Sequence, residues 1–255
     1  MATYKKRGYK PKSKEDKRAA IEDQSTTAEV FNTLDEGASK TEEWVVKNQK
    51  YIFVVVALVA AVVLGYLGYK NFIQEPRESE AMNDMYQAQK YFDEAVVATE
   101  KDSLFTLSLS CGEGKYGFLD IVENHGGTNA ANLSSYYAGM AYLNLKDYQN
   151  AIKYLSDFKS DDQALGPLAA GGIGDAFAQI DQLEDALSYY EKASEMKTNE
   201  FTTPMFLYKA GTVALKLGKN DKALKYFTRI KEEFSKSTEA SNIDVFIGKA
   251  KAASN

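Results

Sequence analysis

Three stretches of this 255-residue sequence resemble one another: YAGMAY at residues 137–142, GIGDAF at 172–177 and KAGTVA at 209–214. Their aligned glycines lie 35 and 37 residues apart. An alanine follows each glycine at a distance of 12 residues, and a large side chain follows each alanine four residues later. These sets are Gly139, Ala151 and Leu155; Gly174, Ala186 and Tyr190; and Gly211, Ala223 and Phe227. The spacing predicts a repeated unit of helix, tight turn and helix.

The recurring glycines require a physical explanation, because glycine inside a helix costs about 1 kcal/mol relative to alanine. We expect the two helices of each unit to cross closely at the glycine, where a side chain would hold them apart. The alanines would form the matching small surface, and the large side chains would fill the space between units. The turns within the units are expected at residues 145–147, 180–182 and 217–219.

A unit of about 34 residues with two antiparallel helices resembles the tetratricopeptide repeat. Three such repeats are predicted over residues 132–236, after a degenerate first helical-repeat unit at 79–131 in which residues 104–116 are expected to be irregular. Residues 237–255 are predicted to form a C-terminal capping helix, because a repeat array needs its last apolar face covered. The inner side of this helix would carry Ile243, Phe246, Ile247 and Ala250. Strand signals are scarce, so the fold class is predicted to be an all-α, tetratricopeptide-repeat α-solenoid.

A second decisive stretch is YIFVVVALVAAVVLGYLGY at residues 51–69, which contains no charged residue and no proline. As a helix it would extend roughly 28 Å, about the thickness of the hydrocarbon core of a bilayer. Lys47 and Lys50 precede it and Lys70 follows it. It lies too far along the chain and is too long for a cleaved signal peptide. We therefore predict a single, uncleaved transmembrane helix, followed by a linker at residues 70–78.

Charge is distributed unevenly on the two sides of this helix. Residues 1–18 contain eight Lys and Arg against two acidic residues, a net charge of +6, whereas residues 70–255 contain 20 basic and 27 acidic residues, a net charge of −7. The positive-inside rule places the basic end in the cytoplasm and the acidic part across the membrane. Residues 1–25 are predicted to be a disordered cytoplasmic tail, and residues 26–50 to form short juxtamembrane helices, the first of them ending near Gly37.

Two features of the amino-terminal part are open to two interpretations. The basic residues of the tail either contact phosphate, on anionic lipid or on the ribosome, or serve only to set the topology; they are Lys5, Lys6, Arg7, Lys10 and Lys12. Small residues four apart in the transmembrane stretch either pack against a partner's transmembrane helix or face lipid; they are Ala57, Ala61 and Gly65.

Stacked helical hairpins form a concave surface that is lined by their first helices. The helical period predicts that Tyr136, Met140 and Asn144 of the first repeat, Asp175 and Gln179 of the second, and Tyr208, Thr212 and Leu215 of the third face this groove. Aromatic, methionine and amide side chains suit an extended or helical peptide. The alternative is that some of these residues belong to the core.

No catalytic constellation is found in the sequence, which predicts a non-enzymatic protein without cofactor or metal. His125 is the only histidine, so the sequence contains no pair of histidines for a metal and gives no support for a Ser–His catalytic triad. We expect His125 to lie in a turn. The run Gly171–Gly174 lacks the lysine and serine of a phosphate-binding loop, so helix packing explains it better. Cys111 is the only cysteine, which excludes a disulfide within the chain.

A basic tail, one uncleaved transmembrane helix and a tetratricopeptide domain together resemble the YfgM-type ancillary subunits of the bacterial SecYEG translocon. The stretches GFLDI at 117–121 and YYAGMAYLNL at 136–145 are similar to the Bacteroidota branch of such proteins. The resemblance implies an inner-membrane protein with a periplasmic domain, association with SecYEG and with a membrane-anchored PpiD-type chaperone, and assistance to newly exported chains. Two alternatives remain open: a scaffold in cell-envelope assembly unconnected to Sec, and a holdase that binds unfolded chains directly.

Overall fold

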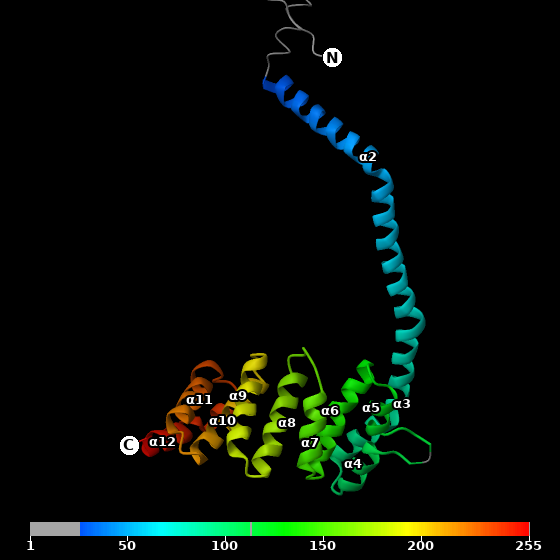
Figure 1. The fold of residues 1–255 in the computed structure, drawn as a ribbon. Helices are drawn as coiled ribbons and strands as arrows, with labels where there is room; N and C mark the ends of the chain where they lie inside the picture. The colour runs from blue at the N-terminus through cyan, green and yellow to red at the C-terminus, as the bar shows by residue number, and fades with distance from the viewer. Residues whose placement is uncertain (1–25, 113, 255) are drawn as a thin grey trace, which may run out of the picture. The chain divides into compact units, whose positions relative to one another are not determined.

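The computed structural model describes the backbone of residues 26–112 and 114–254, with side chains from residue 42 onward (Figure 1). These residues form helices joined by short connections and contain no strand, which confirms the all-α prediction for the described ranges. The chain divides after Tyr69 into two compact units. The basic tail, with Lys5, Lys6, Arg7, Lys10 and Lys12, lies outside the described residues.

The first unit contains one long helix, α2 (Thr26–Tyr69). The prediction that a short helix ends near Gly37 was wrong, because α2 continues through this residue. One glycine costs about 1 kcal/mol, which good helix formers on both sides can outweigh. Among the described residues, the helical stretch Glu42–Val97 is long and apolar enough to cross a membrane, and none of its most apolar window is buried. That residues 51–69 cross a bilayer remains a prediction.

The segment at residues 70–78, predicted as a linker, is helical. A π-helical segment, η1 (Lys70–Gln74), follows α2 directly and leads into α3 (Glu75–Val97). Pro76 lies in the first turn of α3, where its missing N–H is tolerated. The apolar positions of α3 are buried at helical spacing: Ala81, Met85, Ala88, Phe92 and Ala95.

The rest of the second unit is a succession of helices packed side by side (Figure 1). The first part of the segment expected to be irregular belongs to α4, so the expectation was wrong there. In α4, Phe105 packs edge-on against Phe92 of α3 with ring centroids 5.3 Å apart. This tertiary contact stabilises a short helix that its own propensity would not predict. The helices are α4 (Asp102–Leu109), α5 (Phe118–Asn124), α6 (Asn129–Asn144), α7 (Tyr148–Asp157), α8 (Leu165–Gln179), α9 (Leu183–Met196), α10 (Thr202–Lys216), α11 (Asn220–Glu233), η2 (Thr238–Asn242) and α12 (Ile243–Ser254).

Three hairpins, α6–α7, α8–α9 and α10–α11, repeat the same close contact between their two helices. A Cβ added at Gly139 would lie 2.5 Å from Cγ of Leu155, and one added at Gly211 would lie 2.5 Å from the ring of Phe227. At Gly174 the corresponding distance to the Tyr190 ring is 2.8 Å. The partner alanines Ala151, Ala186 and Ala223 are fully buried. The expected packing reason for the glycines is therefore confirmed.

The same explanation holds for the glycine run in α8. A Cβ at Gly171 would collide with the Phe206 ring of α10 at 1.9 Å, and one at Gly172 would lie 3.0 Å from Cδ1 of Leu155 in α7. Two faces of α8 therefore lack side chains, and α7 and α10 approach its backbone there. The glycine run is a packing feature, as the sequence analysis expected.

The turns within the three hairpins are equivalent in backbone conformation. Lys146, Asp181 and Gly218 have φ values of 65°, 60° and 71° and lie in the left-handed region. The next residue in each turn donates its N–H to a carbonyl five residues earlier, as Asp147 does to Tyr142 at 2.9 Å. This is the Schellman arrangement that ends a helix and allows the chain to reverse.

Polar contacts connect α3 to the first hairpin. The carboxylate of Glu78 accepts hydrogen bonds from the backbone N–H groups of Asn129 at 2.7 Å and Ala130 at 2.9 Å, so α3 caps the amino-terminal end of α6. Asp84 of α3 lies 2.9 Å from Nε2 of His125, which ends α5 and is buried. These contacts place α3 and α5 against α6.

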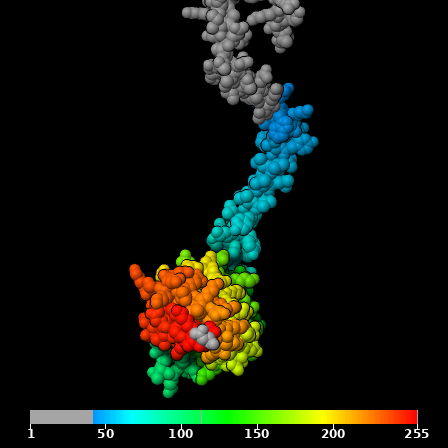
Figure 2. Space-filling model, turned by 90° about the vertical axis from the view of Figure 1, so that its left-hand side faces the viewer, coloured from blue at the N-terminus to red at the C-terminus, as the bar shows by residue number. Residues whose placement is uncertain are grey.

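The far end of the array is formed by η2 and α12, shown in red beside α11 in Figure 2. The four residues predicted for the inner side of this helix all contribute to the last core cluster: Ile243, Phe246, Ile247 and Ala250. They contact the side of the core formed by α10 and α11. The capping role of α12 remains a prediction, but its apolar residues lie where that role requires them.

We predict that Gly139→Ala destabilises the protein, because the new methyl group would overlap Leu155, including its backbone nitrogen at 3.0 Å. Overpacking costs about 1–3 kcal/mol, and the gain in helix propensity is about 1 kcal/mol, so a net loss of up to about 2 kcal/mol is expected. Urea unfolding of the full chain in detergent, followed by circular dichroism, measures this loss.

The matched control is Gly248→Ala in α12, where an added Cβ meets nothing within 4 Å. This variant should be unchanged or stabilised by up to about 1 kcal/mol. If the two variants shift stability equally, the close crossing at Gly139 is not a constraint on the fold.

Candidate functional site

The residues predicted to line one concave groove are distributed over two pockets and a packed region. Tyr136, Met140 and Asn144 of α6 line a pocket of about 400 Å³ together with residues of α3 and α4. Its apolar walls include Phe92, Val96, Phe105 and Leu165. Nζ of Lys101 donates to Oδ1 of Asn144 at 3.2 Å, which places one basic group at this pocket.

The second pocket, of about 380 Å³, lies between the carboxyl-terminal ends of α6 and α8. Asn144, Asp175 and Gln179 line it, and Lys146 and Tyr148 contribute from the first turn and α7. Asn144 therefore borders both pockets. The structure brings five of the eight predicted groove residues to this part of the array.

The three predicted residues of the third repeat line neither pocket. The Tyr208 ring packs against Phe246 of α12 with centroids 5.0 Å apart, and against Phe227 at 6.2 Å. Thr212 donates its hydroxyl to the carbonyl of Tyr208 at 2.9 Å, and Leu215 packs against the last core cluster. Tyr208 and Leu215 therefore pack against the core, which was the alternative to a place in the groove.

Asp175 connects three helices and is not an isolated carboxylate. Its Oδ1 and Oδ2 accept hydrogen bonds from Lys209 of α10 at 2.7 and 2.8 Å, and Oδ1 also accepts from the Tyr190 hydroxyl of α9 at 2.7 Å. Burial raises the pKa of Tyr190, and the adjacent Asp175 charge raises it further. Because both partners occupy this carboxylate, it orients neighbouring repeats.

Tyr136 is buried, with 8 % of its surface exposed. It belongs to a small core cluster with Leu155, Ala169 and Ile173, which lies between the first and second hairpins. Its ring lies 5.2 Å from that of Phe158. Burial raises the pKa of its hydroxyl, with a smaller contribution from Tyr137. Tyr136 thus forms the wall of the 400 Å³ pocket from within the core.

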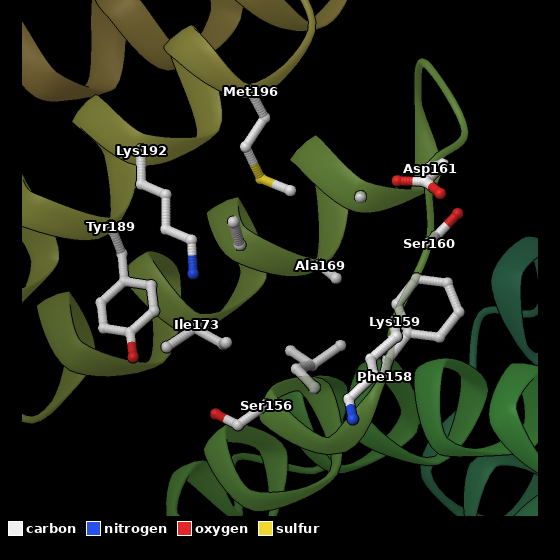
Figure 3. Close-up of a pocket in the computed structure, with 13 residues that line it drawn as sticks. Ser156, Phe158, Lys159, Ser160, Asp161, Ala169, Ile173, Tyr189, Lys192 and Met196 are labelled. Atoms are coloured by element: carbon white, nitrogen blue, oxygen red, sulfur yellow. The ribbon is translucent and has the colours of Figure 1, made fainter.

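A third pocket was not predicted from the sequence. It has a volume of about 520 Å³ and lies between α7, the α7–α8 connection, α8 and α9 (Figure 3). Small residues of α8 and buried Leu155 and Ile173 form its floor. Its rim carries polar and charged side chains: Ser156, Lys159, Ser160, Asp161 and Lys192.

The composition of α8 explains why this pocket exists. Gly166, Ala169 and Ala170 face it and occupy little volume, so α7 and α9 are not bridged by large side chains there. The only signal in the sequence was the small-residue stretch LGPLAAGG at residues 165–172. That stretch indicates close packing of neighbouring helices, but it does not show on which side of the helix a pocket remains.

His125 and Cys111 are both placed by packing in the second unit. Buried His125 lies against the half-buried Asp84, and the Tyr116 ring lies edge-on to the imidazole with ring centroids 6.0 Å apart. Burial raises the pKa of the Cys111 thiol, and the negative charge of Asp120 raises it further. The raised pKa disfavours the reactive thiolate. Among the described residues, no cluster of His, Cys, Asp and Glu could hold a metal ion.

The predicted packing face of the apolar helix consists of Ala57, Ala61 and Gly65, which are exposed in α2. A Cβ added at Gly65 would meet nothing within 4 Å. The face is therefore accessible, and its use for helix packing remains a prediction.

Comparison with known proteins identifies the repeats. The tetratricopeptide repeat family matches residues 134–162 and 206–237, which cover most of α6–α7 and α10–α11. The hairpin α8–α9 lies between the matched ranges and has the same glycine-over-ring contact. The chain therefore contains tetratricopeptide repeats, and no catalytic family is indicated. A search of curated proteins finds no relative that matches the chain.

We predict that Tyr136→Ala lowers the free energy of unfolding by about 3 kcal/mol, because it leaves a cavity beside Leu155 and Phe158. Gln179→Ala, at an exposed position of the second pocket, should change stability by no more than about 0.5 kcal/mol. Urea unfolding of the full chain in detergent compares the two. Equal stabilities of the two variants would contradict the core position of Tyr136.

Because a substitution of Tyr136 is expected to change stability, groove binding is better tested at Asn144 or Gln179.

Proposed function

We propose that this chain is a non-enzymatic adaptor that a single transmembrane helix holds at the bacterial inner membrane, with its repeats in the periplasm. The observation that carries the proposal is the combination of one long, exposed apolar helix with an array of tetratricopeptide repeats. Such repeats mediate protein–protein interaction through surfaces formed by stacked helices. The excess of basic residues before the apolar helix supports a cytoplasmic amino terminus.

The partner assignment rests on the resemblance to YfgM-type proteins. We propose that the repeats dock the SecYEG translocon, or a PpiD-type chaperone anchored beside it, and thereby assist newly exported chains. The two pockets that share Asn144 support a peptide-docking role, because both lie between repeats and combine apolar or aromatic walls with a few polar groups. A tethered domain would also have a raised effective concentration near the translocon exit. The basic tail would contact anionic lipid or the ribosome.

The topology leads to a direct prediction. Protease added outside spheroplasts should degrade the part of the chain after residue 70, because the proposal places that part in the periplasm. Immunoblotting with antibodies against each end of the protein measures this, and a cytoplasmic protein serves as the control for intact cells. A protected carboxyl-terminal part in a membrane-associated protein would contradict the orientation.

The docking surface can be tested by photo-crosslinking in cells. A benzoylphenylalanine introduced in place of Asn144, which borders both pockets, should crosslink to SecY or to a membrane-anchored chaperone. The control position is Lys225 of α11, which is exposed and lines neither pocket. Mass spectrometry of the crosslinked products identifies the partner.

The alternatives give different outcomes in the same experiment. Products that contain only cell-envelope assembly proteins would favour a scaffold unconnected to Sec. Many different unfolded clients, together with suppression of aggregation by the purified protein, would favour a holdase. Identical products from Asn144 and Lys225 would contradict docking at the two pockets.

A further inference from the structure

We propose that the 520 Å³ pocket between α7, α8 and α9 is a second docking site, which binds a partner segment carrying an acidic side chain next to an apolar one. It is lined by different residues from the two pockets that share Asn144, and the inference does not depend on the translocon assignment. Its volume lies within the range of about 300–1,000 Å³ that is usual for ligand pockets.

The charge at its rim indicates the acidic part of the ligand. Lys159 and Lys192 both line the pocket, and within the described part of the chain neither ammonium group lies within 4.0 Å of a carboxylate. Residues 70–255 have a net charge of −7, so two lysines without acidic partners at one pocket depart from the character of the domain. A carboxylate between them would gain charge-assisted hydrogen bonds.

Contacts hold the backbone of Lys159 and the side chain of Lys192. The backbone of Lys159 exchanges two hydrogen bonds with the side chain of Asn132 in α6, with distances of 2.8 and 3.0 Å. Nζ of Lys192 lies 5.6 Å from the centre of the Tyr189 ring, and that ring stacks on Phe177 of α8 at 5.4 Å. The backbone at Lys159 and the ring beneath Lys192 are therefore fixed before binding, which reduces the entropy lost on binding.

The interior indicates the apolar part of the ligand. Leu155, Ala169, Ala170 and Ile173 line the floor, although each is at most 5 % exposed in the chain itself. The Met196 side chain reaches over the floor from α9 (Figure 3) and can adapt to different shapes. An aromatic or aliphatic side chain that enters here would complete the small core between the first and second hairpins.

The position of Asp161 gives the site a direction. It lies at the end of the pocket opposite Lys192 (Figure 3), where a second negative charge would be repelled. The neighbouring Asp162 accepts hydrogen bonds from the N–H groups of Ala164 and Leu165 at 2.7 and 2.9 Å, which fixes this connection. An acidic residue is therefore expected near Lys192, with the apolar residue toward Gly166 and Met196.

The experiment is a selection from a displayed library of random octapeptides on the full chain in detergent micelles. Enriched sequences should contain Asp or Glu one or two positions from an aromatic or aliphatic residue. Synthetic peptides from this set should bind the Lys159→Gln/Lys192→Gln double variant at least about tenfold more weakly, because charged hydrogen bonds are lost. Their Glu-to-Gln counterparts should bind the unaltered protein with a similar loss, and salt should weaken the acidic peptides only.

Two further variants separate the pocket from general charge effects. Lys216→Gln with Lys225→Gln removes the same charge at exposed positions outside the pocket and should leave binding unchanged. Ser156→Trp at the exposed rim should block binding without removing charge. The proposal is overturned if no acidic–apolar sequence is enriched, if enriched peptides bind the double variant equally well, or if the control pair weakens binding as much. Crosslinking at Asn144 is unaffected by any of these outcomes.

Discussion

The contact between a glycine of one helix and a large side chain of the next is the constraint on which the repeat array depends. Leu155, Tyr190 and Phe227 lie against Gly139, Gly174 and Gly211, where no Cβ would fit without movement. Such a contact fixes both the distance between the helices and their register, because the large side chain can face only the gap left by the glycine. Repetition of one hairpin geometry then makes the hairpins stack in the same way along the chain.

The pockets follow from the same use of small residues. The glycines of α8 allow two other helices to approach its backbone closely, α7 through Leu155 and α10 through Phe206. A helix that is narrow enough for these approaches has little volume left to fill the remaining space between α7 and α9. The cluster around Tyr136 and Ile173 is accordingly small, and its members line two pockets, Tyr136 one of them and Ile173 the other. Close packing in one direction thus produces open surface in another.

Periodicity in the sequence was sufficient to predict the hairpins and their internal turns, because each depends on residues fewer than 20 positions apart. One error occurred where a tertiary contact decided the outcome, because α4 packs Phe105 on Phe92. The other was local, since Gly37 lies inside a helix that a single glycine did not end. Helical spacing places Tyr208 on one face of α10, but it cannot show that the Phe246 ring packs against it. The pocket beside Lys192 depends on three helices together, which no local pattern describes.

The modest size of the pockets agrees with the proposed attachment to a membrane. A pocket of about 380–520 Å³ accepts one or two side chains, and its walls are only partly polar, so a single site gives limited affinity. An adaptor that diffused freely would need a larger interface to hold a partner. For a domain confined beside its partner, the effective concentration is high and weak contacts suffice. The pocket beside Lys192 and the pair of pockets that share Asn144 differ in chemistry, so together they would add specificity. Only a partner with a suitable segment for each site could occupy both at once.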